Sequence, residues 1–346
     1  MRAKAIQTIG PASKSQPVLE RVIGRGQMQA ARLNCSHAVT SSHYHEFLEV
    51  AATIRRLAVQ SGQHVSIFYD TPGHKIRITG INEPVPLKEG MIVTFSDTYA
   101  GLIRCTQPGY LELGEVGRKV YIGDGGADDP QLTILDKDHG LLKCQVNSGK
   151  KLEPRKGLTI EGAKVSLLGL PAVSEADVVA IKAAIEANAD YIGMSYGTHA
   201  SQFQTFIDTA RRLGAKPGTK FVFKYELGET EKDLDRIVEL ADAMYLGQGD
   251  LNLSVPYWEV VRHRDRVIQA CQAAGKECWV GTGLLMSMVK GSIPKPGEFA
   301  GLLQVLKAGA TALVLSDEFT VANDPAASAA VLYNSILMAN GETIAV

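Results

Sequence analysis

Eight short apolar segments alternate with amphipathic helical patterns along this chain, and that alternation constrains the fold more than any other feature. The expected strands span 3–9, 28–34, 65–70, 190–196, 219–226, 242–247, 277–282 and 311–316. The expected helices span 38–60, 174–187, 199–213, 230–240, 255–274, 298–308 and 325–339. Eight strands alternating with helices is the count of a closed α/β barrel, the (β/α)8 TIM barrel. A doubly wound open sheet is the alternative, because periodicity alone does not prove closure.

The segment 73–161 differs from the rest of the chain. It contains short β-rich runs separated by Gly, Asp and Asn, and it has no long helical pattern. We therefore expect a small all-β lid domain at 73–161, inserted after the third strand of a barrel domain that comprises 1–72 and 162–346. An insertion at this point lies on the catalytic face of such barrels, where it can close over a substrate.

Composition limits the classes of partner. With a formal net charge of −1, the 346-residue chain lacks the basic excess that nucleic acids or anionic membranes require. No apolar run approaches the roughly 18 residues of a membrane span. The five cysteines form no C-x-x-C pair, which argues against a disulfide framework and fits a reducing compartment. We expect a soluble, cytoplasmic protein that binds neither nucleic acid nor membrane.

One lysine and two carboxylates stand at the ends of two neighbouring expected strands. Lys224 and Glu226 end the fifth strand, and Asp250 follows the sixth. Hard cations such as Mg²⁺ bind one or two carboxylates together with substrate oxygens, and the lysine would supply fixed positive charge. A salt bridge between the strands is the simpler interpretation, but it leaves one negative charge uncompensated. We expect Leu251 to begin a short helix whose first N–H groups face an anion.

Further polar residues stand at the ends of the other expected strands. They are Arg32, Asn34, Ser36 and His37 at the second strand, Asp70 and Thr71 at the third, Ser195 at the fourth and Thr282 at the seventh. Arginine binds phosphate through two hydrogen bonds, and Asn and Ser oxygens suit a monovalent cation or a ribose. Turn hydrogen bonds and helix caps are the alternative role for these residues.

Ten motifs follow one another along the chain: TIGPAS, ARLNCSH, DTPGHKIR, VYIGDGG, RKGLTI, LPAVSEAD, FKYE, GQGDL, GTGLLMSM and LSDE. In order and at comparable spacing, they resemble successive motifs of pyruvate kinases. From about residue 3 to about residue 335, the chain therefore resembles the barrel and lid domains of that family. The resemblance implies a phosphotransferase of glycolytic type that converts phosphoenolpyruvate and ADP into pyruvate and ATP.

The resemblance also implies roles for individual residues. Lys224 would stabilise the phosphoryl group in transfer and the enolate that it leaves. Glu226 and Asp250 would hold the divalent cation, Mg²⁺ or Mn²⁺. Thr282, together with the backbone at Gly249 and Asp250, would bind the substrate carboxylate and lie on the route of protonation.

The same resemblance assigns the phosphate, nucleotide and potassium contacts. Arg32 would act catalytically on the phosphates beside Arg77, and Ser195 would lie against the substrate. The nucleotide-binding positions are Pro11, Arg32, His37, Arg77 and Lys156. The positions that match the ligands of the family's potassium site are Asn34, Ser36, Asp70 and Thr71.

Several motifs depart from the family pattern. Lys75 stands where potassium-dependent members have Glu, and its tethered ammonium can replace the cation, so we expect no K⁺ requirement. Gln248 replaces the usual Arg beside the metal ligand, and Tyr196 begins a run that replaces Phe-Ile-Arg. We expect no counterpart of the family's C-terminal domain. We therefore expect no regulation through that domain, and a homo-oligomer smaller than or different from the family tetramer.

Two other functions remain alternatives. A relative with a changed substrate would apply metal–enolate chemistry to another enol or oxo acid, as a kinase, aldolase or decarboxylase. Gln248 and the altered segment after the fourth strand motivate this hypothesis. A non-catalytic binding protein is the other alternative, and the retention of Lys224 and Asp250 argues against it.

Overall fold

A computed structural model describes residues 2–37, 41–97, 102–126 and 128–344. Within these ranges, eight parallel strands close into a barrel in the order β1-β17-β16-β15-β14-β13-β3-β2. They are β1 (Lys4–Thr8), β2 (Ala30–Asn34), β3 (Ser66–Asp70), β13 (Tyr191–Met194), β14 (Lys220–Tyr225), β15 (Ala243–Gly247), β16 (Glu277–Gly281) and β17 (Ala312–Leu315). Closure confirms the (β/α)8 barrel and excludes the open sheet.

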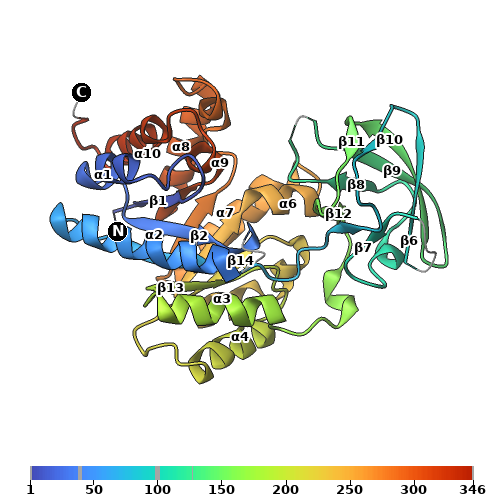
Figure 1. The fold of residues 1–346 in the computed structure, drawn as a ribbon, viewed down its shortest axis with the longest axis horizontal. Coiled ribbons are helices and arrows are strands. Elements are labelled where there is room, and N and C mark those ends of the chain that lie inside the picture. The colour runs from blue at the N-terminus through green and yellow to red at the C-terminus, as the bar shows by residue number, and fades with distance from the viewer. Residues whose placement is uncertain (1, 38–40, 98–101, 127, 345–346) are drawn as a thin grey trace.

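Helices surround the barrel (Figure 1). They are α1 (Gln16–Gly24), α2 (Ser41–Gln60), α3 (Glu175–Glu186), α4 (Ala200–Arg212), α5 (Leu234–Leu240), α7 (Glu259–Ala274), α8 (Pro296–Ala308) and α10 (Pro325–Ala339). The shorter helices α6 (Gln248–Ser254) and α9 (Asp317–Thr320) follow β15 and β17. Seven of these helices correspond to the expected ones, although residues 38–40 of the first expected helix lie outside the described ranges.

Helix α1 follows β1 and was not among the ranges expected from the sequence. Two of the expected helix starts were wrong. The helix expected from Leu251 begins at Gln248, so Asp250 lies in its first turn rather than before it. The expected helix 230–240 is divided into a 3₁₀ segment, Gly228–Asp233, and α5.

Helix α3 shows how local sequence fixes the start of the second half of the barrel. The Ser174 hydroxyl accepts a hydrogen bond from the Asp177 N–H, and the Asp177 carboxylate accepts from the Ser174 N–H. This reciprocal pair is a capping box, which satisfies two N–H groups at the start of the helix. The Asp177 carboxylate also accepts a hydrogen bond of 2.8 Å from the Gly73 N–H, which ties the first linker of the insertion to the barrel.

The barrel interior is filled by side chains. Phe68, Tyr191, Tyr245 and Trp279 pack edge to face there, with 5.3 Å between the ring centroids of Phe68 and Trp279. A second and larger apolar layer lies between the strands and the surrounding helices. Because the interior is packed, space for a ligand arises at the ends of the strands rather than along the axis.

The chain between β3 and α3 forms an antiparallel β lid beside the barrel (Figure 1). Its strands are β4 (Ile78–Thr79), β5 (Val85–Pro86), β6 (Ile92–Ser96), β7 (Arg104–Cys105), β8 (Lys119–Ile122), β9 (Gln131–Asp138), β10 (Leu141–Ser148), β11 (Lys151–Leu152) and β12 (Leu158–Ile160). The largest sheet in the described part of the lid has the order β12-β8-β9-β10-β6. The lid has its own apolar core, centred on Phe95, Leu132 and Leu142. The expected insertion after the third strand is confirmed.

None of the helices in the described ranges combines the length and the apolarity that a membrane crossing requires.

Candidate functional site

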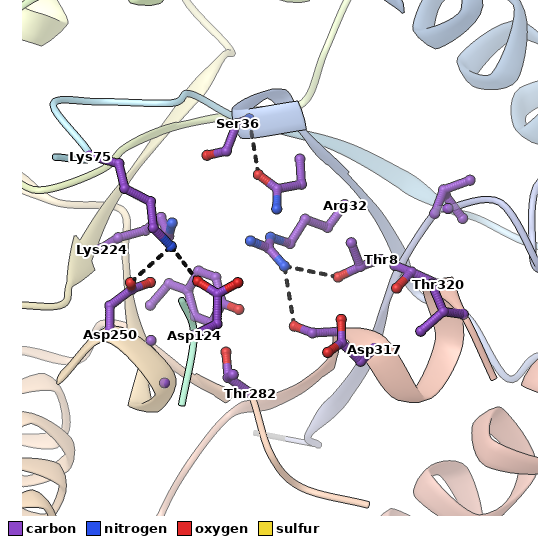
Figure 2. Close-up of a pocket in the computed structure, with 18 of the residues that line it drawn as sticks. Thr8, Arg32, Ser36, Lys75, Asp124, Lys224, Asp250, Thr282, Asp317 and Thr320 are labelled. Atoms are coloured by element: carbon purple, nitrogen blue, oxygen red, sulfur yellow. Dashed lines mark hydrogen bonds and ion pairs between the residues drawn. The ribbon is translucent and has the colours of Figure 1, made fainter. Parts of the chain in front are cut away.

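A cavity of about 570 Å³ opens at the C-terminal ends of the barrel strands, between the barrel and the lid (Figure 2). The barrel contributes loops that follow β1, β2, β13, β14, β15, β16 and β17, and the lid side contributes Lys75, Arg77 and Asp124. The expected site residues that line this cavity are Pro11, Arg32, Asn34, Ser36, Lys75, Arg77, Lys224, Glu226, Gly249, Asp250 and Thr282. Residues from both halves of the barrel and from the lid therefore meet in one place.

Lys224 lies at the floor of the cavity with its ammonium surrounded by oxygen atoms. Its Nζ lies 2.7 Å from Glu226 Oε1 and 3.2 Å from Asp70 Oδ2, and it donates to Ser195 Oγ at 3.0 Å. Burial lowers the pKa of Lys224, but the charges of Asp70 and Glu226 outweigh this effect and raise it. The side chain therefore remains charged at neutral pH.

Alternation along β14 explains why Lys224 and Glu226 share the cavity. Residues two apart on a strand point to the same face, so Tyr225 between them points outward. There its hydroxyl contacts the ring of His263 at 2.7 Å. The sequence Lys-Tyr-Glu thus places two opposite charges inside the barrel mouth and one aromatic ring in the outer layer.

The carboxylates of Glu226 and Asp250 influence one another. Burial raises the pKa of Glu226, Lys224 lowers it, and repulsion from Asp250 raises it further, so that the net direction is upward. Burial also raises the pKa of Asp250, but the Lys75 and Lys224 ammonium groups outweigh burial and lower it. Two carboxylates that repel one another across a cavity are a suitable pair of ligands for a hard cation.

The donor set fits Mg²⁺ or Mn²⁺ rather than a metal held wholly by protein. In the part of the chain that the structure describes, no group of three or more His, Cys, Asp or Glu side chains could hold a metal ion. Mg²⁺ is commonly bound by one or two carboxylates, with water and substrate oxygens at its other positions. Glu226 and Asp250 provide that minimum.

The four residues expected to match potassium ligands fall into two pairs. Asp70 and Thr71 are fully buried beneath the cavity. Asp70 Oδ2 accepts from Arg32 at 2.6 and 2.8 Å, and the Thr71 hydroxyl donates to the Gly193 carbonyl at 2.8 Å. Asn34 and Ser36 line the cavity instead, and Asn34 Oδ1 accepts from the Ser36 N–H.

Lys75 makes its ion pairs on the other side of the cavity. Its Nζ lies 2.6 Å from Asp124 Oδ1 of the lid and 3.2 Å from Asp250 Oδ1 of the barrel (Figure 2). The ammonium expected to replace a monovalent cation is therefore bound to an expected ligand of the divalent cation. It connects the lid to the barrel through two carboxylates.

The expected nucleotide residues are divided between the cavity and the lid. Arg77 lines the cavity and donates to the Arg155 carbonyl at 3.1 Å. Lys156 lies outside the cavity, with its Nζ 3.8 Å from Glu153 and 3.9 Å from Asp129. Ser195 also lies outside it, beneath Lys224. The side chain of His37 lies outside the described part of the chain.

Thr282 and Gly249 meet at close range where β16 and β15 end. Thr282 has a φ of 73°, a left-handed conformation that is unusual for a β-branched residue. A Cβ on Gly249 would lie 2.7 Å from Thr282 Cγ2, so a side chain at position 249 would force this segment to shift. The Gln248 amide donates to the Thr282 carbonyl at 3.4 Å.

The sequence model of the pyruvate kinase barrel domain matches residues 1–329. The chain belongs to the pyruvate kinase family. It is 30% identical to pyruvate kinase from Geobacillus stearothermophilus over 331 residues, which are 94% of this chain and 54% of that protein. It is 31% identical to human pyruvate kinase PKLR, covering 92% of this chain and 56% of that protein. The chain thus spans about half the length of these curated relatives.

A solved pyruvate kinase has the same fold. The crystal structure of the enzyme from Cryptosporidium parvum superposes with a TM-score of 0.85 at 24% sequence identity, covering 98% of this chain and 69% of that one. The likeness extends through the barrel and the lid.

Pyruvate kinase motifs predicted most of the cavity, but three contacts were missed. Tyr196 touches both expected metal ligands, Asp124 reaches Lys75, and the Arg32 guanidinium lies over the Tyr245 ring, 5.4 Å from its centroid. For Tyr196 a signal existed, because the residue follows β13 directly and the C-terminal ends of barrel strands carry the active site.

Proposed function

We propose that this member of the pyruvate kinase family transfers the phosphoryl group of phosphoenolpyruvate to ADP, giving pyruvate and ATP. Glu226 and Asp250 would hold Mg²⁺ or Mn²⁺. One observation carries the proposal: a single cavity contains a buried lysine, two mutually repelling carboxylates and two arginines. Phosphoryl transfer needs this kind of fixed charge and positioning more than it needs covalent chemistry.

The reaction gives separate tasks to Lys224, to the two arginines and to Thr282. When bound, the divalent cation neutralises charge on the phosphate and enolate oxygens. Lys224 supplies a fixed ammonium where negative charge develops on the enolate oxygen, and Arg32 and Arg77 balance the phosphate charges. The Thr282 hydroxyl holds the substrate carboxylate and passes a proton toward the enolate carbon.

We further propose that catalysis does not require K⁺. The Asp70 carboxylate already has two cationic partners, Arg32 and Lys224, so the protein neutralises it without an added ion. Lys75 adds a third fixed positive charge that faces the same cavity.

A substrate-switched relative is the second candidate. Gln248 supports it, because its amide contacts the Thr282 carbonyl and brings no charge to the edge of the cavity. A smaller positive field would suit an enol or oxo acid that carries less negative charge than phosphoenolpyruvate.

The deciding experiment measures pyruvate from phosphoenolpyruvate and ADP in a coupled assay with Mg²⁺, in tetramethylammonium or potassium buffer. We expect equal turnover in both buffers. Lys224→Met should lower kcat by at least ~100-fold, because a fixed charge aimed at the reacting oxygen is lost.

The matched control is Lys220→Met. Lys220 begins the same strand, is exposed, and lies over the Tyr191 ring at the opposite end of the barrel. We expect this variant to keep wild-type turnover. If folded wild-type protein that binds Mn²⁺ shows no turnover in both buffers, the result would contradict the kinase and favour the substrate-switched relative. Turnover in potassium alone would contradict K⁺ independence.

A further inference from the structure

Tyr196 contacts both expected metal ligands. It directly follows the turn residue Ser195 after β13, and its backbone N–H donates to Glu226 Oε2 at 3.0 Å. Its hydroxyl donates to Asp250 Oδ1 at 2.9 Å. One residue therefore joins the Glu226 carboxylate, directly after β14, to the Asp250 carboxylate of α6 through two different groups.

The backbone at Tyr196 is held in a disfavoured conformation. Its φ of 57° lies in the left-handed region, which costs a residue with a Cβ about 1 kcal/mol or more. Close packing on both sides maintains it. A Cβ on Gly197 would lie 2.7 Å from the Phe223 ring, and one on Gly73 would lie 2.5 Å from the Ser195 carbonyl oxygen. The surrounding turn thus fixes the direction of the Tyr196 N–H and side chain.

The two oxygens of Asp250 are used unequally. Oδ1 accepts from the Tyr196 hydroxyl and from Lys75 Nζ, whereas no hydrogen bond or ion pair to Oδ2 is found among the described residues. The Asp250 carboxylate is therefore oriented before any ligand arrives. Lys75 and Tyr196 respond differently when a cation binds to Asp250. A cation at Asp250 repels the Lys75 ammonium, but a neutral hydroxyl can stay on Oδ1.

We propose that Tyr196 is a positioning residue that holds Asp250 and Glu226 in the orientation that binds a divalent cation. Its hydroxyl occupies one Asp250 oxygen and leaves the other for the cation, while its N–H fixes the rotation of the Glu226 carboxylate. The role rests on the metal site of the proposed function. Groups that orient metal ligands from behind typically change metal affinity by about 10- to 100-fold when they are removed.

The test measures Mn²⁺ binding to the full chain without substrates, by electron paramagnetic resonance of free Mn²⁺. Tyr196→Phe keeps the ring and the strained backbone and removes only the hydroxyl. We expect its Kd for Mn²⁺ to rise about tenfold or more. Its melting temperature in EDTA should stay close to that of the wild type, because Asp250 keeps Lys75 as a partner. In the coupled assay, the Mn²⁺ concentration for half activation should rise more than kcat falls.

Two further variants serve as controls for this result. Tyr191→Phe removes a phenol hydroxyl at the start of β13, the strand that precedes Tyr196. There the Tyr191 hydroxyl contacts Lys4 Nζ at 3.4 Å. This variant should bind Mn²⁺ like the wild type. Asp250→Asn should remove tight binding.

Three outcomes would overturn the inference. Unchanged Mn²⁺ affinity in Tyr196→Phe would overturn the positioning role and leave the proposed function intact. An equal loss in Tyr191→Phe would show that the effect is general rather than local. Failure of the wild type to bind Mn²⁺ would overturn the metal site itself, and the positioning role with it.

Discussion

At the scale of single residues, two of the residues with a strained backbone belong to the cavity. Tyr196 and Thr282 both have positive φ values, of 57° and 73°, and both line the cavity. Strained backbone persists where the surroundings determine it, and it is common at ligand sites because it sets exact directions for polar groups. The close approach of Gly249 to Thr282 belongs to the same arrangement.

Gly249→Ala tests that close approach. The added Cβ would lie 2.7 Å from Thr282 Cγ2, so the two strand ends must separate or α6 must shift. We expect about 1–3 kcal/mol of destabilisation, as for other overpacked sites, together with a higher KM for phosphoenolpyruvate. Chemical denaturation and steady-state kinetics would measure the two effects.

The control is Gly297→Ala in α8, where an added Cβ meets no atom within 4 Å. It should be neutral or slightly stabilising, because alanine favours a helix over glycine. Wild-type stability and KM in Gly249→Ala would show that the Thr282 contact is not required.

His263 predicts a pH dependence of stability away from the cavity. Burial lowers its pKa from the ordinary 6.5, with Glu231 raising it and Arg262 lowering it, and the ring contacts the Tyr225 hydroxyl. Below pH 6.5 the unfolded chain binds more protons at this site than the folded chain, so stability falls as the pH falls. The slope for one site is at most ~1.4 kcal/mol per pH unit. Denaturation between pH 5 and 8 should show this loss.

The matching variants are His263→Gln and His139→Gln. The first should flatten the dependence below pH 6.5, because the titrating group is gone. The second replaces a side chain that is 99% exposed and should leave it unchanged. Identical slopes in the wild type and His263→Gln would refute the assignment.

At the scale of elements, the lid is held to the barrel by charge. Lys75, between β3 and β4, joins Asp124 of the lid to Asp250 of α6. Lys75 is mostly buried, whereas Asp124 is exposed to solvent, so water screens part of this attraction.

Lys75→Met should loosen the lid. A partly exposed ion pair contributes up to about 1 kcal/mol, which corresponds to roughly a fivefold larger population of open molecules. Hydrogen exchange of the β12 amides, which lie near α6, should become faster by a similar factor. Lys88→Met, which changes an exposed lysine elsewhere in the lid, should exchange like the wild type. Equal exchange in Lys75→Met would mean that packing alone closes the lid.

Long elements could be predicted from the sequence, whereas short ones could not. Every barrel strand lies within two residues of its expected bounds, because its apolar run reflects burial on both faces. Helix α6 was placed too late because glycines at 247 and 249 suggested a loop. Seven residues are also too few to show a helical period.

The sequence also located some of the site residues better than others. Lys224 and Glu226, in the motif FKYE, both line the cavity. The partners of Asp70 and Lys75 could not be predicted, because those ion pairs join segments whose separation only the folded chain determines. Ser195 and Lys156 lie outside the cavity for the same reason.

At the scale of the whole molecule, the carboxylates predict that a divalent cation stabilises the fold. Glu226 and Asp250 repel one another when both are charged, and a bound cation removes that repulsion. Mn²⁺ at 100 times its Kd should add about 2.7 kcal/mol to the free energy of unfolding. Thermal denaturation with Mn²⁺ or EDTA would measure the shift. In Asp250→Asn the shift should disappear, and its persistence there would place the cation elsewhere.

Regulation and assembly also belong to this scale. The chain spans about half of its curated relatives. The expected absence of C-terminal-domain regulation and the expected homo-oligomer remain predictions, for effector titration and light scattering respectively.

The position of the lid in the chain has a consequence for how the barrel assembles. Thr71 and Gly193 are hydrogen-bonded across adjacent strands although 122 residues separate them. Closing a long flexible loop costs entropy, and such distant contacts slow folding. The lid has its own core, and Arg77 pairs with Gly157 near its two ends. A lid that folds first therefore shortens the flexible loop between β3 and β13. Mutations in the lid core would then delay closure of the barrel, although they change no barrel residue.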